Sequence, residues 1–360
     1  MISICIIVGA RPNFVKVAPL IRAIEKTDGA TYTLIYAGSE DDTTIESSLF
    51  DDLEMPRPQV FLGVESSKLN EITAQVMERF DHFLDSNKAD VVIVVDDLAS
   101  TMAAAIVTKK RGLKLAHLVA GTRSFDIKMP KEVNRLVIDA LSDYLFTAGM
   151  RSNSVATREG GDTGQTFMVG NILMDSLRFC KNKMRKPQCY SQLHLEENKY
   201  IVLTINRKRL IEDAGFMRRL VTTLEQSGLT VVAPLRGQAN ETVRKLIASD
   251  SNINLIDSLP YLEFGFLSAQ AGGMVTDSGN VSEEATFNGV PCITLNSYTE
   301  HIETVTVGTN VLVGGDTILL GEELKKLKDG QWKTGHLPNR WDGRTAERIV
   351  GMLIADSEKD

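Results

Sequence analysis

Residues 2–26 read ISICIIVGARPNFVKVAPLIRAIEK, a short unit whose pattern recurs along the chain. An almost entirely apolar run leads into Gly9, and a segment with apolar residues three and four positions apart follows it. An uninterrupted apolar run is typical of a strand buried on both faces, and the second spacing is typical of an amphipathic helix. The stretch therefore predicts a strand, a tight turn and a helix.

The same alternation continues to the end of the chain. Further candidate strands are YTLIYA, VVIVV, LAHLV, YLFTA and TFMV in the first half, and YIVLTI, TVVAPL, INLID, GGMVTD and PCITL in the second. Repeated β–α units favour parallel sheets with helices on both faces, so we predict an α/β fold of two doubly wound, Rossmann-like domains. The basic, polar residues 180–199 are interpreted as the connection between them. Ligands bind such sheets at the carboxyl ends of the strands, which predicts a site in a cleft between the domains.

Composition limits the partners of the protein. The 360 residues carry a net charge of −7, which argues against non-specific binding to nucleic acid. No apolar run approaches the length of a membrane span, so no membrane insertion is expected, and the opening residues do not form a signal peptide. The four cysteines lack metal spacing, although Cys180 and Cys189 could pair. This cysteine usage fits a reducing, cytoplasmic location.

Two turns have residues suited to anions. Arg11 and Lys16 flank the start of the first helix, where free backbone N–H groups favour negative charge. The alternative is a plain turn with a solvated arginine. In VTDSGNVSEEATFNGVP, residues 275–291, Asp277, Ser278 and Gly279 end a strand, and Glu284 follows in a helix. This pattern predicts a diphosphate at the Ser-Gly turn and a ribose at a carboxylate on the first helical turn, although glutamates there also complement the helix dipole.

Other polar residues follow predicted strands. Asp96 and Asp97 stand at a strand end, where a carboxylate pair suits sugar hydroxyls or acid–base chemistry; capping of the next helix would explain only one of them. Asn206, Arg207 and Arg236 predict a cationic rim for phosphate.

Two histidines are singled out. His117 interrupts an apolar strand and is interpreted as a hydrogen-bonded core residue on its own, whereas polar neighbours place His301 in a ligand loop. No histidine or cysteine pair has metal spacing, so no metal is predicted.

Taken together, these motifs resemble the non-hydrolysing UDP-N-acetylglucosamine 2-epimerase family nearly from end to end. The matching segments are GARPNFVKVAPLIRAI, AHLVAGTRSFDIKMPKEVNRLVIDALSDYLF, VGNILMDSL, DSGNVSEEA, TEHIETVTVGTNVLVG and WDGRTAERIV. The resemblance implies a glycosyltransferase-B-like fold whose C-terminal helix crosses back to the first domain. The domains would then be 1–170 plus 345–360, on the sugar side, and 171–344, which binds UDP.

The resemblance also implies the chemistry. Such enzymes invert C2 of the sugar by eliminating UDP and adding it back, without a metal or other cofactor, and a homodimer is expected. Residues that match nucleotide- and sugar-binding positions are Arg11, Lys16, Asp97, His117, Glu132, Asn134, Arg135, Ser278, Gly279 and Glu284. Departures from the family pattern are Asp96 for Gly, Val119 and Lys131 for Glu, and Asn206 and Arg236 for His.

We therefore predict a UDP-sugar 2-epimerase-like isomerase that acts on a precursor of surface polysaccharide. Asp97, Asp96 and Glu132 are the remaining candidates for proton transfer, since Val119 and Asn206 cannot move a proton at neutral pH. Two alternatives stay open: a nucleotide-sugar-binding homologue without activity, and a glycosyltransferase on the same fold.

Overall fold

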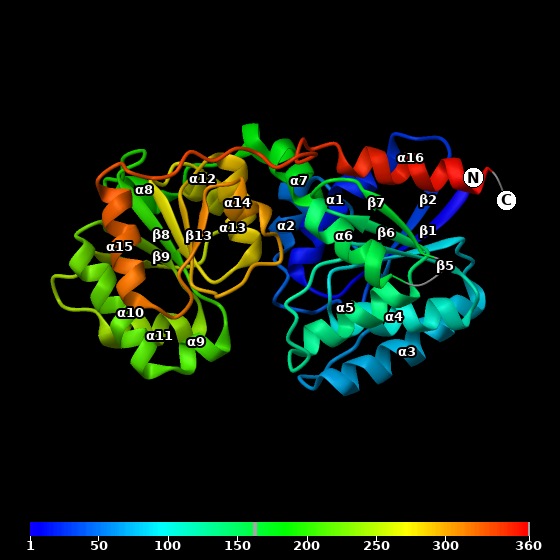
Figure 1. The fold of residues 1–360 in the computed structure, drawn as a ribbon. Coiled ribbons are helices and arrows are strands. Elements are labelled where there is room, and N and C mark those ends of the chain that lie inside the picture. The colour runs from blue at the N-terminus through cyan, green and yellow to red at the C-terminus, as the bar shows by residue number, and fades with distance from the viewer. Residues whose placement is uncertain (161–163, 359–360) are drawn as a thin grey trace. The chain divides into compact units, whose positions relative to one another are not determined.

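The computed structural model describes residues 1–160 and 164–358, and the chain divides into two compact units. The first unit comprises Met1–Phe179 and Asn339–Asp360, and the second comprises Cys180–Pro338. Each unit contains one parallel sheet with helices on both faces (Figure 1). The predicted α/β fold with two doubly wound sheets is confirmed. The basic residues 180–199 open the second unit, where Lys181–Lys183 form a 3-10 turn and Gln188–Gln192 form helix α8.

The sheet of the first unit has the order β3-β2-β1-β4-β5-β6-β7. Its strands are β1 (Ile2–Val8), β2 (Ala30–Tyr36), β3 (Val60–Phe61), β4 (Val91–Val95), β5 (Lys114–Leu118), β6 (Tyr144–Thr147) and β7 (Gln165–Met168). Its helices are α1 (Arg11–Glu25), α2 (Ser47–Leu53), α3 (Leu69–Ser86), α4 (Ala99–Lys110), α5 (Pro130–Leu141), α6 (Met150–Glu159), α7 (Ile172–Cys180) and α16 (Thr345–Ser357). The order of strands reverses between β1 and β4, and ligands bind at such a switch point in open α/β sheets.

The sheet of the second unit has the order β10-β9-β8-β11-β12-β13. Its strands are β8 (Tyr200–Thr204), β9 (Thr230–Pro234), β10 (Ile253–Ile256), β11 (Gly273–Thr276), β12 (Cys292–Thr294) and β13 (Asn310–Leu312). Besides α8, its helices are α9 (Lys208–Glu212), α10 (Ala214–Ser227), α11 (Gly237–Leu246), α12 (Tyr261–Ala269), α13 (Gly279–Asn288), α14 (Glu303–Thr306) and α15 (Thr317–Lys328). Here the switch point lies between β8 and β11.

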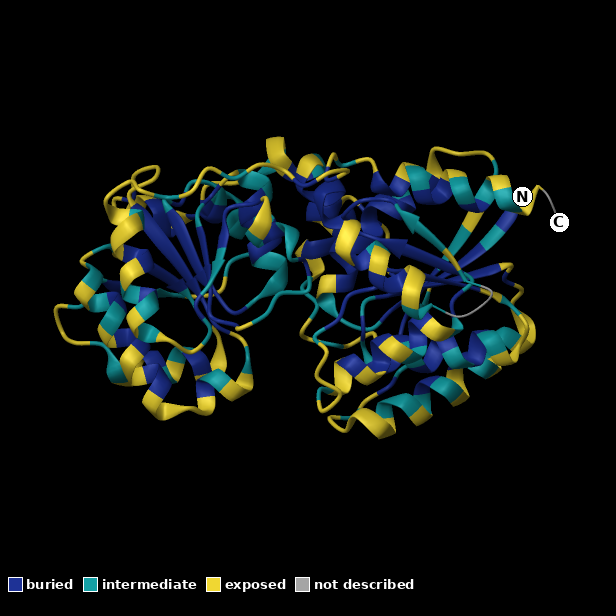
Figure 2. Cartoon of the chain, viewed as in Figure 1, coloured by how far each residue is buried: buried dark blue, intermediate teal, exposed yellow. Residues whose placement is uncertain are grey.

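Both sheets are buried, whereas the helices are exposed along their outer faces (Figure 2). Every β1 residue except the intermediate Ser3 is buried, as its apolar run predicts. The short strands β3 and β13 were not predicted as strands, because two or three residues are too few to show a periodic pattern. All four cysteines are buried free thiols, so Cys180 and Cys189 do not pair.

The C-terminal helix α16 packs against α1 and β1 of the first unit, which confirms the predicted return of the chain. Asp175 on α7 accepts hydrogen bonds from the backbone N–H groups of Thr345 and Ala346, at 3.2 and 2.8 Å. These groups open the helix and have no partner within it, so the carboxylate caps α16. Trp341, just before the helix, is buried and donates to the carbonyl of Ala148.

Candidate functional site

Asp96 lies at the end of β4, beside the switch point of the first sheet. Its carboxylate accepts from Lys16 Nζ at 2.6 Å and from Asn13 Nδ2 at 2.8 Å, and both donors stand on α1. The backbone of Asp96 is left-handed, with φ of 59°. Non-glycine residues adopt that conformation at a cost, and such residues gather at functional sites. The turn after β4 and the first helix are thus joined through Lys16, although Arg11 instead pairs with Glu46.

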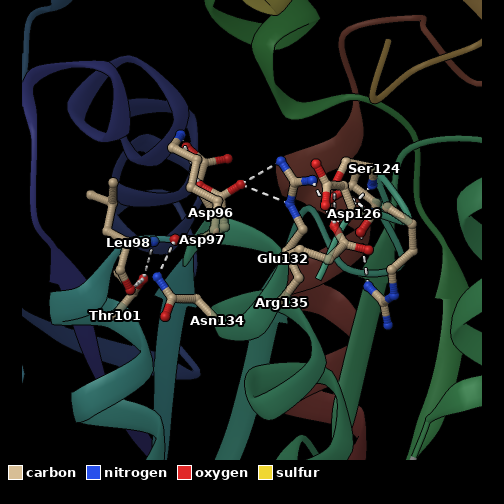
Figure 3. Close-up of polar contacts among 12 residues, drawn as sticks. Asp96, Asp97, Leu98, Thr101, Ser124, Asp126, Glu132, Asn134 and Arg135 are labelled. Atoms are coloured by element: carbon tan, nitrogen blue, oxygen red, sulfur yellow. Dashed lines mark hydrogen bonds and ion pairs between the residues drawn. The ribbon is translucent and has the colours of Figure 1, made fainter. Parts of the chain in front are cut away.

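Asp97 is buried and lies among cations of helix α5 (Figure 3). Arg135 Nε and Nη2 lie 2.8 and 2.6 Å from its Oδ2, and Lys131 Nζ lies 3.0 Å from its Oδ1. Asn134 donates to the main-chain oxygen of Asp97 at 2.8 Å. Leu98, not Asp97, occupies the N-cap of α4, so the capping alternative for Asp97 is wrong. Asp97 instead binds Lys131, Asn134 and Arg135, which all stand on α5.

Glu132 is buried in the first turn of α5 and binds the loop before the helix (Figure 3). Its Oε2 accepts from Ser124 N and Ser124 Oγ, at 2.8 and 2.9 Å, and its Oε1 accepts from Phe125 N at 3.0 Å. Arg135 Nη1 lies 3.1 Å from the same Oε2. A carboxylate with this many donors is fixed in place.

These contacts bear on proton transfer by the predicted acid–base groups. Burial acts to raise the pKa of Asp97, but the charges and hydrogen bonds of Lys131 and Arg135 outweigh it, and the pKa is lowered. For Glu132, burial is outweighed by the hydrogen bonds of Ser124 and Phe125 and by Arg135, and the pKa is again lowered. Both groups are therefore weak bases that remain ionised, and they suit binding and orientation.

His117 lies at the centre of a buried network behind these groups. Its Nδ1 is 2.6 Å from Asp139 Oδ1, and its Nε2 is 2.9 Å from the main-chain oxygen of Asp96. Asp139 Oδ2 lies 2.7 Å from Arg123 Nη1, and Arg123 Nε lies 3.0 Å from Glu159. The interpretation of His117 as a hydrogen-bonded strand residue agrees with this geometry. The ring contacts the turn after β4 directly, through the main-chain oxygen of Asp96.

Val119 and Lys131 stand at positions where the resemblance implies glutamate, and the structure places them in different surroundings. Val119 follows β5 with φ of 74°, a left-handed conformation that is unfavourable for a β-branched side chain. Lys131 is 56% exposed and pairs with Asp97. This cation occupies the surface side of the Asp97 carboxylate, while Arg135 occupies the buried side.

In the second unit, Asp277 at the end of β11 shapes the loop after β8. Its carboxylate accepts from the backbone N–H of Asn206 at 2.9 Å and of Arg207 at 2.6 Å. Arg207 in turn donates to the Asp277 carbonyl at 3.1 Å and to Tyr298 Oη at 3.1 Å. Hydrogen bonds of Asp277 therefore hold the loops after β8 and β11 together. Arg207 is half-buried at the edge of these loops.

Helix α13 begins at Gly279, with Ser278 at its N-cap. Its first N–H groups are a ready site for an anion. Glu284 lies at the sixth helical position, so the expectation of a first-turn carboxylate is wrong. His301 lies in the loop between β12 and α14, where it is buried, with Nε2 3.6 Å from Glu283 Oε1. Arg236 is exposed at the N-cap of α11.

The sequence prediction missed several residues of both clusters: Asn13, Arg123, Asp139, Asn296 and Tyr298. Asp139 stands four positions after Arg135, which itself stands four after Lys131, so one face of α5 carries all three toward the strand ends. That spacing was a signal in the sequence. Asn296 donates to the Asp277 carbonyl at 2.8 Å across 19 positions, and no local pattern could show it.

Within residues 1–160 and 164–358, no group of three or more His, Cys, Asp or Glu could hold a metal ion. Across the same residues, no helix has both the length and the apolar character to cross a membrane.

Two Rossmann-like units, with polar clusters at both switch points and a C-terminal helix returned to the first unit, define a class of α/β protein that binds its ligands at the strand ends. The family model described as UDP-N-acetylglucosamine 2-epimerase matches residues 22–354, and the chain belongs to that family. Members of this family are isomerases.

Individual relatives support the same family. A UDP-N-acetylglucosamine 2-epimerase homolog of Methanococcus maripaludis is 32% identical over 98% of this chain and 99% of its own. A Pseudomonas aeruginosa protein, named UDP-2,3-diacetamido-2,3-dideoxy-D-glucuronate 2-epimerase, is 29% identical over 98% of this chain and 99% of its own. The crystal structure of Methanocaldococcus jannaschii UDP-GlcNAc 2-epimerase in complex with UDP-GlcNAc and UDP has a TM-score of 0.84 at 30% identity, and covers 98% of this chain and 99% of its own.

Proposed function

We propose that this protein inverts C2 of UDP-N-acetylglucosamine, or of a related UDP-sugar. It would eliminate UDP together with the C2 proton, and then add UDP back at C1 and a proton to the opposite face of C2. The observation that carries the proposal is that each unit has a polar cluster at its own switch point, in a chain of the epimerase family. The similar M. jannaschii enzyme was crystallised with UDP-GlcNAc and UDP. The name of the P. aeruginosa relative, a 2-epimerase of a different UDP-sugar, supports a wider range of UDP-sugar substrates. The role in surface polysaccharide synthesis stays a prediction.

The second unit would hold the nucleotide. The N–H groups at the start of α13, after Ser278 and Gly279, suit the diphosphate, and Arg207 and Arg236 add positive charge. Glu284 would accept hydrogen bonds from the ribose. Asn206 and His301 complete the proposed binding set, with His301 acting from within the fold through Glu283.

The first unit would serve the sugar. Arg11, Lys16 and Arg135 provide cations, and Asp96, Asp97 and Glu132 provide carboxylates. Asp96 is the best placed of the three to exchange a proton, because it stands at the strand tip and its side chain keeps 18% exposure, against 10% for Asp97 and 3% for Glu132. Asp97 would orient Arg135 and Lys131.

Proton NMR of UDP-N-acetylglucosamine with the protein in heavy water tests this function. Elimination removes the C2 proton, so deuterium should appear at C2 and a second UDP-sugar should accumulate. D96N should slow the exchange by about 100-fold or more, because general acid–base catalysis supplies that much. D81N, at an exposed ion pair on α3, is the matched control and should leave the rate unchanged.

Absence of exchange with intact UDP binding would contradict the proposal and identify a binding protein. Transfer of the sugar only when an acceptor is added would identify a glycosyltransferase. We further propose that the protein works in the cytoplasm, where UDP-sugars are made, and as a homodimer. Light scattering during gel filtration tests the dimer: a mass near twice the 39.6 kDa of the chain supports it, and a mass of one chain refutes it.

A further inference from the structure

The ring of His117 faces two hydrogen-bond acceptors. Its Nε2 meets the carbonyl oxygen of Asp96 at 2.9 Å, and its Nδ1 meets a carboxylate oxygen of Asp139 at 2.6 Å. A carbonyl oxygen has no proton to donate, and a neutral imidazole carries only one N–H. A neutral ring would therefore leave one of the two contacts without a proton, unless Asp139 itself were protonated.

Asp139 is held in its ionised form. Its second oxygen accepts from Gly121 N at 3.1 Å and lies 2.7 Å from Arg123 Nη1. Burial acts to raise the pKa of Asp139, but the charges and hydrogen bonds of His117 and Arg123 outweigh it, so the pKa is lowered. The proton between Asp139 and His117 consequently belongs to the ring.

Two arginines neutralise the two carboxylates of the network. Arg123, whose side chain is 2% exposed, lies between Asp139 and Glu159, and Arg158 Nη2 lies 2.6 Å from Glu159 Oε1. The ionised form of Asp139 is therefore stabilised by the buried Arg123, and both acceptors that face the ring lack a proton of their own.

The ring joins two elements of the site. On one side it donates to the carbonyl of Asp96, whose backbone is left-handed and needs support from its surroundings. On the other side it holds Asp139, one helical turn beyond Arg135 on α5. A second link between the same elements runs from Asp97 to Arg135. The two links together determine how α5 faces the turn after β4.

We infer that His117 is a positioning residue that carries both ring protons and ties the Asp96–Asp97 turn to helix α5, so that the Asp97–Arg135 pair and Asp96 face the substrate in a fixed arrangement. The effect on catalysis rests on the proposed function. The protonation and the two contacts do not, and they are tested separately.

Nitrogen NMR of protein labelled with ¹⁵N-histidine tests the protonation at pH 8. His117 should show a directly bonded proton on both ring nitrogens, with the exposed His82 as an internal reference for a ring in water. Signals are assigned with single His→Gln variants of the remaining rings, so the measurement uses the intact network. A ring nitrogen of His117 that bears no proton would overturn the inference.

Kinetics test the positioning role. Glutamine donates to one acceptor and carries no charge, so H117Q should lower kcat for C2 exchange by about 100-fold, as expected for misplaced groups, with KM and UDP affinity nearly unchanged. S142A removes another buried hydrogen bond of α5, to the carbonyl of Ile138, and is the matched control with unchanged kcat. An unaltered kcat in H117Q would refute the positioning role. If wild-type protein shows no exchange at all, the proposed function fails while NMR still decides the inference.

Discussion

Arg135 approaches one oxygen of Asp97 with two of its nitrogens, Nε at 2.8 Å and Nη2 at 2.6 Å. Both side chains are buried, and Arg135 also reaches Glu132 with Nη1. The pair joins the turn after β4 to helix α5, which are separated by 38 positions in the sequence. Together with the contacts of His117, this pair determines how α5 faces the turn after β4.

Breaking this pair should be costly. We expect R135M to lower the free energy of unfolding by about 3–5 kcal/mol, because it leaves Asp97 and Glu132 buried without their main cation. Urea unfolding measures it. R111M, which breaks an ion pair with the exposed Asp81 and Asp85, is the control and should cause a much smaller loss. Equal losses in the two variants would show that burial of the Asp97 pair does not matter.

Stability should fall in acid. The pKa values of Asp97, Glu132 and Asp139 are lowered in the folded protein, so below about 4.5 the unfolded state takes up protons that the native state does not. Their contribution is fully present above the unfolded values, 3.8 for Asp and 4.5 for Glu, and is lost as the pH falls through the folded ones. Unfolding in urea from pH 7 to 3 should show this decline, and D97N should decline less steeply.

Asp175 should have the opposite effect on the pH dependence of stability. Burial raises its pKa against the hydrogen bonds from Thr345 and Ala346, so its contribution is lost as the pH rises through the folded value. The free energy of unfolding of D175N, relative to that of the wild type, should therefore be higher at pH 7 than at pH 4. The same urea titration checks this difference, and a difference of the reverse sign would contradict the burial argument.

Gly121 should not tolerate alanine. Its φ is 75°, and an added Cβ would stand 2.1 Å from the carbonyl oxygen of Ser152. We expect G121A to cost about 2–5 kcal/mol from the left-handed backbone and the clash together. G112A is the matched control, since Gly112 has φ of 73° with nothing within 4 Å of the added atom. Thermal unfolding of both variants separates the cost of the left-handed backbone from the cost of the clash. Similar losses of stability in the two variants would mean that Ser152 moves away from the added methyl group at little cost.

Val119 stores backbone strain that another residue can relieve. Asparagine tolerates the left-handed region, so V119N should raise the free energy of unfolding by about 0.5–1 kcal/mol. The same change at Val133, which is helical and exposed, should produce no gain. Chemical unfolding compares them. A loss in V119N would show that the packing of the valine side chain outweighs its backbone strain.

Asp277 should control nucleotide affinity without touching the nucleotide. D277N removes one acceptor of the backbone N–H groups of Asn206 and Arg207, so the loop loosens, and we expect UDP to bind about 10-fold more weakly. Calorimetry measures the affinity. K208A, at an exposed lysine that pairs with Glu212, is the control and should bind UDP normally. Unchanged affinity in D277N would remove Arg207 from the proposed nucleotide site.

Much of the molecule was predictable from local patterns. Apolar runs and helical spacing are properties of neighbouring residues, so the sequence alone determined eleven of the strands, the parallel α/β class and the placement of Asp96 and Asp277 at strand ends. The linked motifs determined the family. The edge strands β3 and β13 were missed because pairing with a neighbouring strand, and not their own two or three residues, makes them strands.

Only the tertiary structure decided what the polar residues do. The pKa of Asp97 is lowered because α5 brings Lys131 and Arg135 against it, and the pKa of Glu132 is lowered mainly because Ser124 and Phe125 donate hydrogen bonds to it. His117 has its role because Asp96 and Asp139 contact it from two other elements. Ionisation and hydrogen bonding depend on distance and burial, and both arise from contacts between residues far apart in the chain. The sequence determined which groups stand at the strand ends, and packing determined which of them hold a proton and which hold one another.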